Sequence, residues 1–269
     1  NLGFMMSGFW GELFWGDTRH GKFPMGWSAC LGDLLGTVPV IADKLAETKP
    51  AGSSVVQFGG GYFYPDLFAS NCPNRPELLR RHARRISDQM QRCGATMLCF
   101  IAEKSDSSPA QEAWKIFAEE IHPLLGIMVM DYAPYNRMQG ATYWMDNGRG
   151  DHVPVVTARY TMWADMKRER AGGPAELSAA INNDATNSLG AVAGWAAVHA
   201  WSKFKDEKTG NYSHGLEAVE KCVKAVDKEM EIVSTRLLSK KGGKSDFVEK
   251  IPANFKAAVI VTSDGTAKG

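Results

Sequence analysis

The chain has 269 residues, which is enough for one large α/β domain or two ordinary ones. Its 31 basic and 30 acidic side chains give a formal net charge of +1, so the overall charge offers no attraction to nucleic acid or to a membrane surface. No apolar run approaches the ~18 residues of a membrane span. We therefore expect neither a nucleic-acid partner nor a membrane span.

The cysteines and the short motifs argue against a metal or a nucleotide cofactor. The five cysteines are odd in number and have no framework spacing, which favours free buried thiols over disulfides. The sequence contains no CxxC or HExxH pair of the kind that binds zinc. Residues 59–61 lack the third glycine of a dinucleotide-binding loop. We expect no metal and no cofactor.

The first third of the chain predicts a helix, a strand and a second helix. Residues 31–48 place apolar side chains at intervals of three and four, which is typical of an amphipathic helix, and Pro39 kinks or divides it. Residues 55–58 are mostly β-branched or aromatic and predict a buried strand. Residues 74–92 begin with an Asn cap and end before Gly94, which predicts the second helix.

The same alternation continues to residue 234. The further predicted strands cover residues 95–101, 126–130, 153–160, 191–199 and 230–234, and the further predicted helices cover residues 108–122, 173–188 and 216–226. Strands and helices that alternate with short connections indicate parallel βαβ units. Fewer than eight units are clear, so we expect an α/β fold of the distorted or incomplete (β/α) TIM-like barrel type.

The most distinctive segment is GGGYFYP, at residues 59–65, directly after a predicted strand. Three consecutive glycines end the strand because glycine adopts backbone angles that other residues avoid. Pro65 fixes its own φ and holds Tyr64 extended. The segment therefore predicts a rigid, aromatic loop at the end of a buried strand.

This segment matches the motif G-x-G-Y-x-Y-P at every position, and the chain resembles the C-terminal domain of the GxGYxYP family of glycoside hydrolases. Three further segments are similar to that domain: residues 19–27 (RHGKFPMGW), 154–160 (PVVTARY) and 199–202 (HAWS). The resemblance implies a barrel-like domain over residues 1–241 and a carbohydrate partner. It also implies a secreted or extracytoplasmic protein.

The remaining residues, 242–269, differ in character. The linker-like sequence KKGGK spans residues 240–244, and residues 255–261 are apolar enough for an edge strand or a contact with a partner. We expect a C-terminal extension after the barrel-like domain. An apolar strand that follows a linker would suit a homo-oligomer or another assembly.

Two carboxylates stand at the ends of consecutive predicted strands. In α/β barrels the active site lies at the C-terminal ends of the strands, and Glu103 and Asp131 are found there. Cleavage of a glycosidic bond usually needs two carboxyl groups, one to protonate the leaving oxygen and one to act as nucleophile or base. We predict Asp131 and Glu103 as that catalytic pair, with Asp17, Asp146 and Asp165 in reserve.

Aromatic and polar side chains at the predicted strand ends and in nearby loops could bind a sugar. The candidates are Trp27, Tyr62, Tyr64, Tyr132, Arg159, Trp163, His199 and Trp201. His199 could instead be a core histidine, and Arg159 could form a structural ion pair. The arginines of residues 80–85 form either an anion patch or the solvated face of a helix, and the second interpretation is favoured.

Two functions remain open from the sequence. The first is a glycoside hydrolase that cleaves a polysaccharide or oligosaccharide by carboxylate acid/base catalysis. The alternative is a non-catalytic carbohydrate-binding or structural protein that keeps a hydrolase-like barrel. Metal-dependent deacetylation by His199 and His214 has little support, because the two residues are loosely spaced.

Overall fold

The computed structural model describes residues 8–122, 124–164, 166, 168–187, 192–207, 209–228, 230–233, 235 and 256–263. The helical elements are η1 (Gly8–Trp10), α2 (Leu31–Thr37), α3 (Pro39–Thr48), α4 (Arg75–Cys93), α5 (Ser108–Glu120), α6 (Pro174–Asn187) and α7 (Gly215–Ala225). The strands are β1 (Met25–Ala29), β2 (Ser53–Phe58), β3 (Met97–Ala102), β4 (Gly126–Asp131), β5 (Thr142–Asp146), β6 (His152–Thr157), β7 (Tyr160–Met162), β8 (Ala171–Gly172), β9 (Val192–His199), β10 (Lys203–Lys205), β11 (Tyr212–His214), β12 (Glu231–Ile232) and β13 (Lys256–Ser263).

The first helices follow their sequence signals. The predicted helix over residues 31–48 is divided at Pro39 into α2 and α3, because proline has no N–H for the helix ladder. α4 ends at Gly94, which adopts a left-handed conformation with a φ of 66°. α5 is capped by Ser107, whose hydroxyl accepts a hydrogen bond from Ala110 N. Local signals therefore set the ends of these helices.

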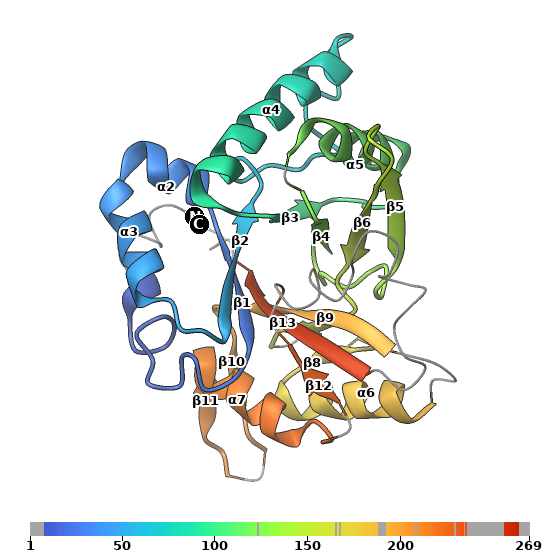
Figure 1. Cartoon of the computed structure of the whole chain (residues 1–269). Coiled ribbons are helices and arrows are strands. Elements are labelled where there is room, and N and C mark those ends of the chain that lie inside the picture. Colours follow the sequence, from blue (N-terminus) through green and yellow to red (C-terminus); the bar gives the residue numbers. More distant parts are fainter. Residues whose placement is uncertain are drawn as a thin grey trace.

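Eleven strands form one large sheet around which the helices are arranged (Figure 1). The strand order is β5-β6-β4-β3-β2-β1-β13-β9-β7-β8, and β12 pairs with β13. Among the described strands of this sheet, only β5 pairs antiparallel, with β6. β10 and β11 form a separate antiparallel pair. Because parallel strands alternate with helices, the predicted α/β class is confirmed.

Strands β6 and β7 are two parts of one extended stretch of chain. Only Ala158 and Arg159 separate them, yet β6 pairs with β4 and β7 pairs with β9. Ala158 N donates to Val129 O of β4 at 2.9 Å, and Arg159 N donates to Trp195 O of β9 at 3.0 Å. The chain thus changes its strand partner within two residues. No ladder joins the end strands β5 and β8 among the described residues, so the TIM-like barrel stays a prediction.

One face of the parallel strands encloses a buried cluster, which we call the inner cluster. Its members from the strands are Val56, Phe58, Cys99, Ile101, Met128, Met130, Trp195 and Ala197. They alternate along β2, β3, β4 and β9 with residues that face outward, as the two-residue period of a strand requires. The outward residues of β3 and β4, such as Phe100 and Val129, pack instead with α4 and α5.

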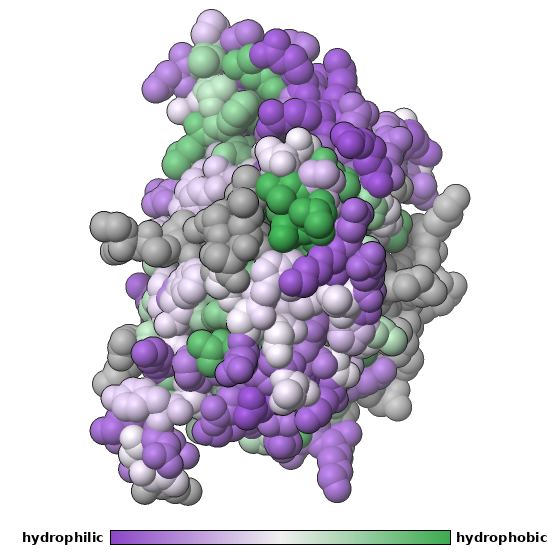
Figure 2. Space-filling model, turned by 90° about the vertical axis from the view of Figure 1, so that its left-hand side faces the viewer, coloured by the Kyte–Doolittle hydropathy of each residue, from purple (hydrophilic) through white to green (hydrophobic). Residues whose placement is uncertain are grey.

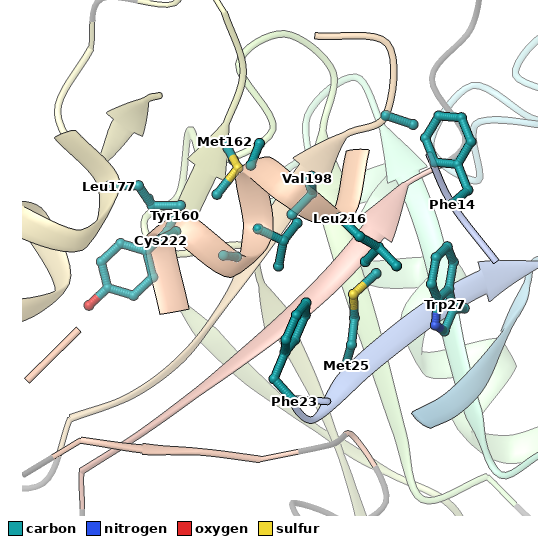
Figure 3. Close-up of a cluster of buried hydrophobic side chains, with 14 of the residues drawn as sticks. Phe14, Phe23, Met25, Trp27, Tyr160, Met162, Leu177, Val198, Leu216 and Cys222 are labelled. Atoms are coloured by element: carbon teal, nitrogen blue, oxygen red, sulfur yellow. The ribbon is translucent and has the colours of Figure 1, made fainter. Parts of the chain in front are cut away.

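A second large core lies between β1, β7, β9 and the helices α6 and α7 (Figure 3). Trp27 is part of it and is only 2 % exposed. Its ring packs against Phe9 and Trp15, at centroid distances of 5.4 and 5.3 Å. The prediction that Trp27 binds sugar is therefore wrong, because the residue lies inside β1 and its outward side chain is covered by the N-terminal aromatic residues.

Figure 2 looks onto the side of the molecule that carries α2 and α3 and shows a compact hydrophobic patch among hydrophilic residues. α3 buries only Leu45, and Val40 of the same helix is 67 % exposed. The apolar side chains of residues 31–48 thus pack only partly into the core.

The C-terminal strand β13 lies inside the sheet. It pairs in parallel with β1 through Val261 and Thr262, and with β9 along its whole length, from Lys256 to Ser263. The prediction of an edge strand in residues 242–269 is therefore wrong in its position, although the strand itself is present. A strand with a partner on each side belongs to the fold of the sheet, and local sequence cannot show which edges it will fill.

Candidate functional site

The loop of residues 59–65 follows β2, between the segments that follow β1 and β3 (Figure 1). Tyr64 of this loop, Tyr132 after β4 and Trp163 after β7 all pack against the inner cluster. Since they follow the C-terminal ends of parallel strands, they lie at one end of that cluster. We call this end the mouth. It is the place where α/β folds of this kind carry their active sites.

Each glycine of the loop has a structural reason. Gly59 and Gly61 have φ values of 49° and 109°, in the region that glycine adopts without strain. A Cβ on Gly60 would lie 2.8 Å from His82 Cε1 of α4, so a side chain there would displace the His82 ring. The three glycines therefore let the loop turn and also lie close against α4.

Three tyrosines lie side by side at the mouth, in the order Tyr62, Tyr64 and Tyr132. Tyr62 Oη lies 3.2 Å from Tyr64 Oη, and the Tyr64 and Tyr132 rings are 6.1 Å apart and nearly perpendicular. Tyr62 is 43 % exposed, so its ring is available to a ligand. Burial raises the pKa of Tyr64, and its hydrogen bond with Tyr62 and the nearby charge of Glu103 raise it further. Tyr64 therefore remains a neutral phenol next to that carboxylate.

Two buried aspartates hold the loop that carries Glu103. Asp66 accepts hydrogen bonds from Glu103 N at 3.3 Å and from Lys104 N at 2.8 Å. Asp131 accepts from Ser105 N at 2.9 Å. Three consecutive backbone N–H groups are thus bonded to carboxylates. The side chain of Glu103 is exposed, and its carboxylate accepts no hydrogen bond from any described residue. The loop is rigid while its acid remains open.

The Asp131 carboxylate is fully occupied. It is 0 % exposed and also accepts hydrogen bonds from Ser105 Oγ and from Arg137 Nη2, each at 3.1 Å. Asp131 continues the outward row of Ile127 and Val129, whereas Glu103 continues the inward row of β3. The predicted neighbourhood of β3 and β4 is confirmed, and Ala102 pairs with Asp131. The Asp131 carboxylate holds Ser105 and Arg137 by hydrogen bonds, and its catalytic role stays a prediction.

Asp33 is a second open carboxylate, which the sequence did not single out. It lies in the first turn of α2, after β1, and a Cβ on Gly61 would be 3.4 Å from its Oδ2 atom. No described residue donates a hydrogen bond to its side chain. Asp33 falls within the predicted helix of residues 31–48, so it did not stand out as a residue at a strand end. Its position four residues after the end of β1 is the signal that could have identified it.

His199 and Trp163 stand on the other side of the mouth. Their rings stack at 4.2 Å, with 13° between the planes, and Trp163 also contacts Tyr135 at 4.7 Å. Ser202 Oγ lies 2.9 Å from His199 Nδ1 and accepts a hydrogen bond from Ala164 N. Burial lowers the pKa of His199 to about 4, so the ring is neutral at physiological pH. A neutral imidazole with an adjacent indole can bind a sugar through hydrogen bonds and stacking.

These residues can be compared with known families. The model of the GxGYxYP putative glycoside hydrolase C-terminal domain matches residues 1–241 of the 269. The chain belongs to this family. No curated protein and no solved structure matches it. In the family motif the two required glycines are Gly59 and Gly61, the two positions with positive φ, while Tyr62 and Tyr64 form the hydrogen-bonded pair.

Arg159 of this GxGYxYP domain lies away from the mouth. It stands between β6 and β7, and its Nε donates to Asp184 Oδ2 of α6 at 2.8 Å. Burial works against the Asp184 charge, but hydrogen bonds from Arg170, Arg159 and Tyr160 outweigh it and lower the pKa of Asp184 to about 2. The sequence placed Arg159 near a strand end, whereas the strand resumes as β7. The substrate-binding assignment is therefore replaced by a structural ion pair.

The remaining candidates have separate surroundings. Trp201 is 39 % exposed and contacts Phe14 at 6.0 Å. Asp17 is buried and paired with Arg19 at 3.0 Å, and Asp146 accepts a hydrogen bond from Gly148 N. Asp165 lies outside the described residues. None of the three aspartates is placed at the mouth by a described contact.

The described part of the chain shows neither a metal cluster nor a membrane-spanning helix. The described residues contain no group of three or more His, Cys, Asp and Glu side chains arranged to hold a metal ion. None of their helices is both long and apolar enough to cross a bilayer. The expected absence of a cofactor stays a prediction.

Proposed function

We propose that the protein is a glycoside hydrolase whose acid/base residue is Glu103, acting at the mouth of a distorted (β/α) barrel on a polysaccharide or oligosaccharide. Its family name supports the reaction class. The observation that carries the residue assignment is the loop of Glu103. Three of its backbone N–H groups are bonded to buried Asp66 and Asp131, while the Glu103 carboxylate stays open. Such a rigid support is what a catalytic group needs to keep its position.

The chemistry needs a second carboxylate on the other side of the scissile bond. Asp33 and Glu103 follow β1 and β3, on the two sides of the glycine-tyrosine loop that follows β2. One of them would protonate the glycosidic oxygen, and the other would act as the nucleophile or activate water. Asp131 is less suited to this step, because both of its oxygens already accept hydrogen bonds. We assign Asp131 to holding the Glu103 loop.

The aromatic side chains of the mouth would hold the sugar rings. Tyr64 lies near Glu103 and packs against Tyr62 and Tyr132. In the stacked pair on the other side, Trp163 follows β7 and His199 ends β9. Flat aromatic faces pack against the apolar faces of pyranose rings. A polymeric glycan of this kind is met mainly outside the cytoplasm, and the proposal accordingly places the protein in an extracytoplasmic compartment.

The test is reducing-end release from a panel of polysaccharides by the parent chain and by single variants. We expect Glu103→Gln to lower the rate by about 10²–10⁴-fold, the usual contribution of general acid/base catalysis, and Asp33→Asn to lower it as well. Glu47→Gln in α3 is the matched control, since Glu47 is also exposed and lies away from the motif loop. It should keep the parent rate.

Two other outcomes would change the proposal. Full activity in Glu103→Gln, with an unchanged unfolding midpoint, would remove Glu103 from the mechanism. If the parent chain releases no reducing ends and is nevertheless retained on an insoluble glycan, the protein is a carbohydrate-binding module. The exposed ring of Tyr62 would then account for the retention, and Tyr62→Ala should abolish it.

A further inference from the structure

A pocket of about 550 Å³ lies beside the glycine-tyrosine loop, on the side of α4. Its walls include Tyr62 and Phe68, together with Arg81, His82 and Arg85 of α4. The volume is within the range of sites that bind small organic ligands. The pocket shares Tyr62 with the mouth, since the hydroxyl of that residue meets Tyr64. It is therefore adjacent to the proposed active site without being part of it.

The arginines of α4 divide into two pairs. Arg80 and Arg84 are turned toward α5, where Glu120 accepts from Arg80 Nη1 at 2.7 Å and from Arg84 Nε at 2.8 Å. Their charges are compensated inside the protein. For this pair the interpretation of the 80–85 cluster as a solvated helix face with acidic neighbours is confirmed.

Arg81 and Arg85 have no such compensation. Arg85 Nη2 donates to Gly60 O at 3.2 Å and lies 3.1 Å from His82 Nδ1, and neither partner carries a negative charge. Arg81 makes no hydrogen bond or ion pair with any described residue. Glu77 and Asp88 stand on the same helix, and neither forms an ion pair with the two arginines. Both arginines are exposed, and their guanidinium groups can bind an external anion.

His82 adds no charge of its own. Burial, together with the neighbouring Arg85, lowers its pKa to about 4. Because an arginine can only donate, the contact with Arg85 leaves the His82 proton on Nε2. Among the described residues that line the pocket, none is acidic. The polar side chains of the pocket thus match an oxyanion.

We propose that this pocket binds the anionic substituent, a carboxylate or a sulfate ester, of a sugar ring, so that the glycan at the neighbouring mouth is an acidic one. The inference rests on the proposed function and names its substrate class. Guanidinium groups bind carboxylate and sulfate oxygens through paired, charge-assisted hydrogen bonds. The faces of Tyr62 and Phe68 provide the apolar surface for the ring that carries the anion.

The test is calorimetric titration with four probes at physiological salt: a uronic-acid oligosaccharide, a sulfated oligosaccharide, a neutral oligosaccharide of equal length, and sodium sulfate. The protein carries Glu103→Gln, so that turnover during the titration is strongly reduced. We expect one of the two acidic saccharides to bind more tightly than the neutral one. Which of them binds identifies the anion. Sodium sulfate should bind more weakly than that acidic saccharide, because it lacks the ring.

Two arginine variants supply the decisive comparison. Arg81→Gln should weaken binding of the acidic saccharide about tenfold or more, which is the effect of losing a charge-assisted hydrogen bond. Arg84→Gln removes the same charge from the same helix, but at a position paired with Glu120, and should change the affinity less than twofold. Binding of the neutral saccharide should be unchanged in both.

Three results would overturn the inference. Equal losses in the two variants would indicate only the general positive field of α4. Equal affinity for neutral and acidic saccharides would remove the anion from recognition, and equal affinity for sodium sulfate would remove the sugar. If neutral glycans are cleaved through Glu103 but acidic ones bind no better, the hydrolase proposal stands and this one fails. If an acidic saccharide binds through Arg81 but no glycan is cleaved, the anion proposal stands and the hydrolase proposal fails.

Discussion

Glu103 and Asp131 follow neighbouring strands and are both carboxylates, but their surroundings differ. Glu103 is exposed beside the tyrosines of the mouth, whereas Asp131 is 0 % exposed and bonded to Ser105 and Arg137. The side of the strand from which each residue projects makes this difference. A carboxylate that is already satisfied supports structure, and an open one is available for chemistry.

Two histidines should make the stability of the fold depend on pH. Burial lowers the pKa of His199 and of His82 to about 4, below the ordinary value of 6.5. Between these values the unfolded chain binds more protons than the folded one, so the free energy of unfolding rises with pH. The contribution of these two neutral histidines to stability is fully present above pH 6.5 and is lost as the pH falls toward 4.

The variant His199→Asn should flatten that dependence, by at most about 1.4 kcal/mol per pH unit between pH 4 and 6.5. His152→Asn is the control, because His152 is exposed at the start of β6 and its replacement should leave the slope unchanged. Urea unfolding at several pH values measures both. A His199→Asn slope equal to that of the parent chain would contradict the assignment.

The loop after β3 shows how an element is held by its neighbours. Asp66, from the segment after the motif, and Asp131, from β4, bond three consecutive N–H groups of residues 103–105. Ser105 O in turn accepts from Trp114 Nε1 of α5 at 3.1 Å. The loop therefore keeps one conformation, although residues 103 and 104 are exposed.

Asp131→Asn should destabilise the protein by about 2–4 kcal/mol, because an amide N–H₂ would face a donor and Arg137 would lose its buried partner. Ser105→Ala removes one hydroxyl bond and should cost about 1 kcal/mol. Asp43→Asn, an exposed change in α3, should stay within about 0.5 kcal/mol of the parent. Denaturant titration compares the three. Equal stability of Asp131→Asn and Asp43→Asn would show that the loop does not depend on this contact.

At the scale of the whole molecule, the sheet depends on residues far apart in the sequence. β13 lies between β1 and β9, although the family model ends at residue 241. Without β13, the backbone N–H and C=O groups of β1 and β9 on its two sides would lose their partners. The predicted division into a domain of residues 1–241 and an extension of residues 242–269 stays a prediction, and the extension supplies β13 to the sheet.

A chain that ends at residue 241 should therefore fail to unfold cooperatively and should aggregate, whereas a chain that ends at residue 263 should behave like the parent. Size-exclusion chromatography and thermal unfolding followed by near-ultraviolet circular dichroism distinguish the two. If the shorter chain gives the parent unfolding midpoint, β13 contributes nothing to the stability of the sheet.

The local features of this protein were determined by its sequence. Helix positions, the division at Pro39, the stop at Gly94 and the strand before the glycines all follow from propensities and periodicities within about twenty residues. The motif at residues 59–65 and the family could also be recognised directly. So could the placement of Glu103 and His199 at strand ends, since each strand is itself a local pattern.

Only the tertiary structure decided which of those strand ends lie together and which side chains meet there. The partner change between β6 and β7 took Arg159 into an ion pair with Asp184, and the N-terminal aromatic residues covered Trp27. The same packing brought the Asp33 carboxylate close to Gly61. The physical reason is that strand pairing and burial join segments far apart in the chain, and neither leaves a periodic signal in any one of them.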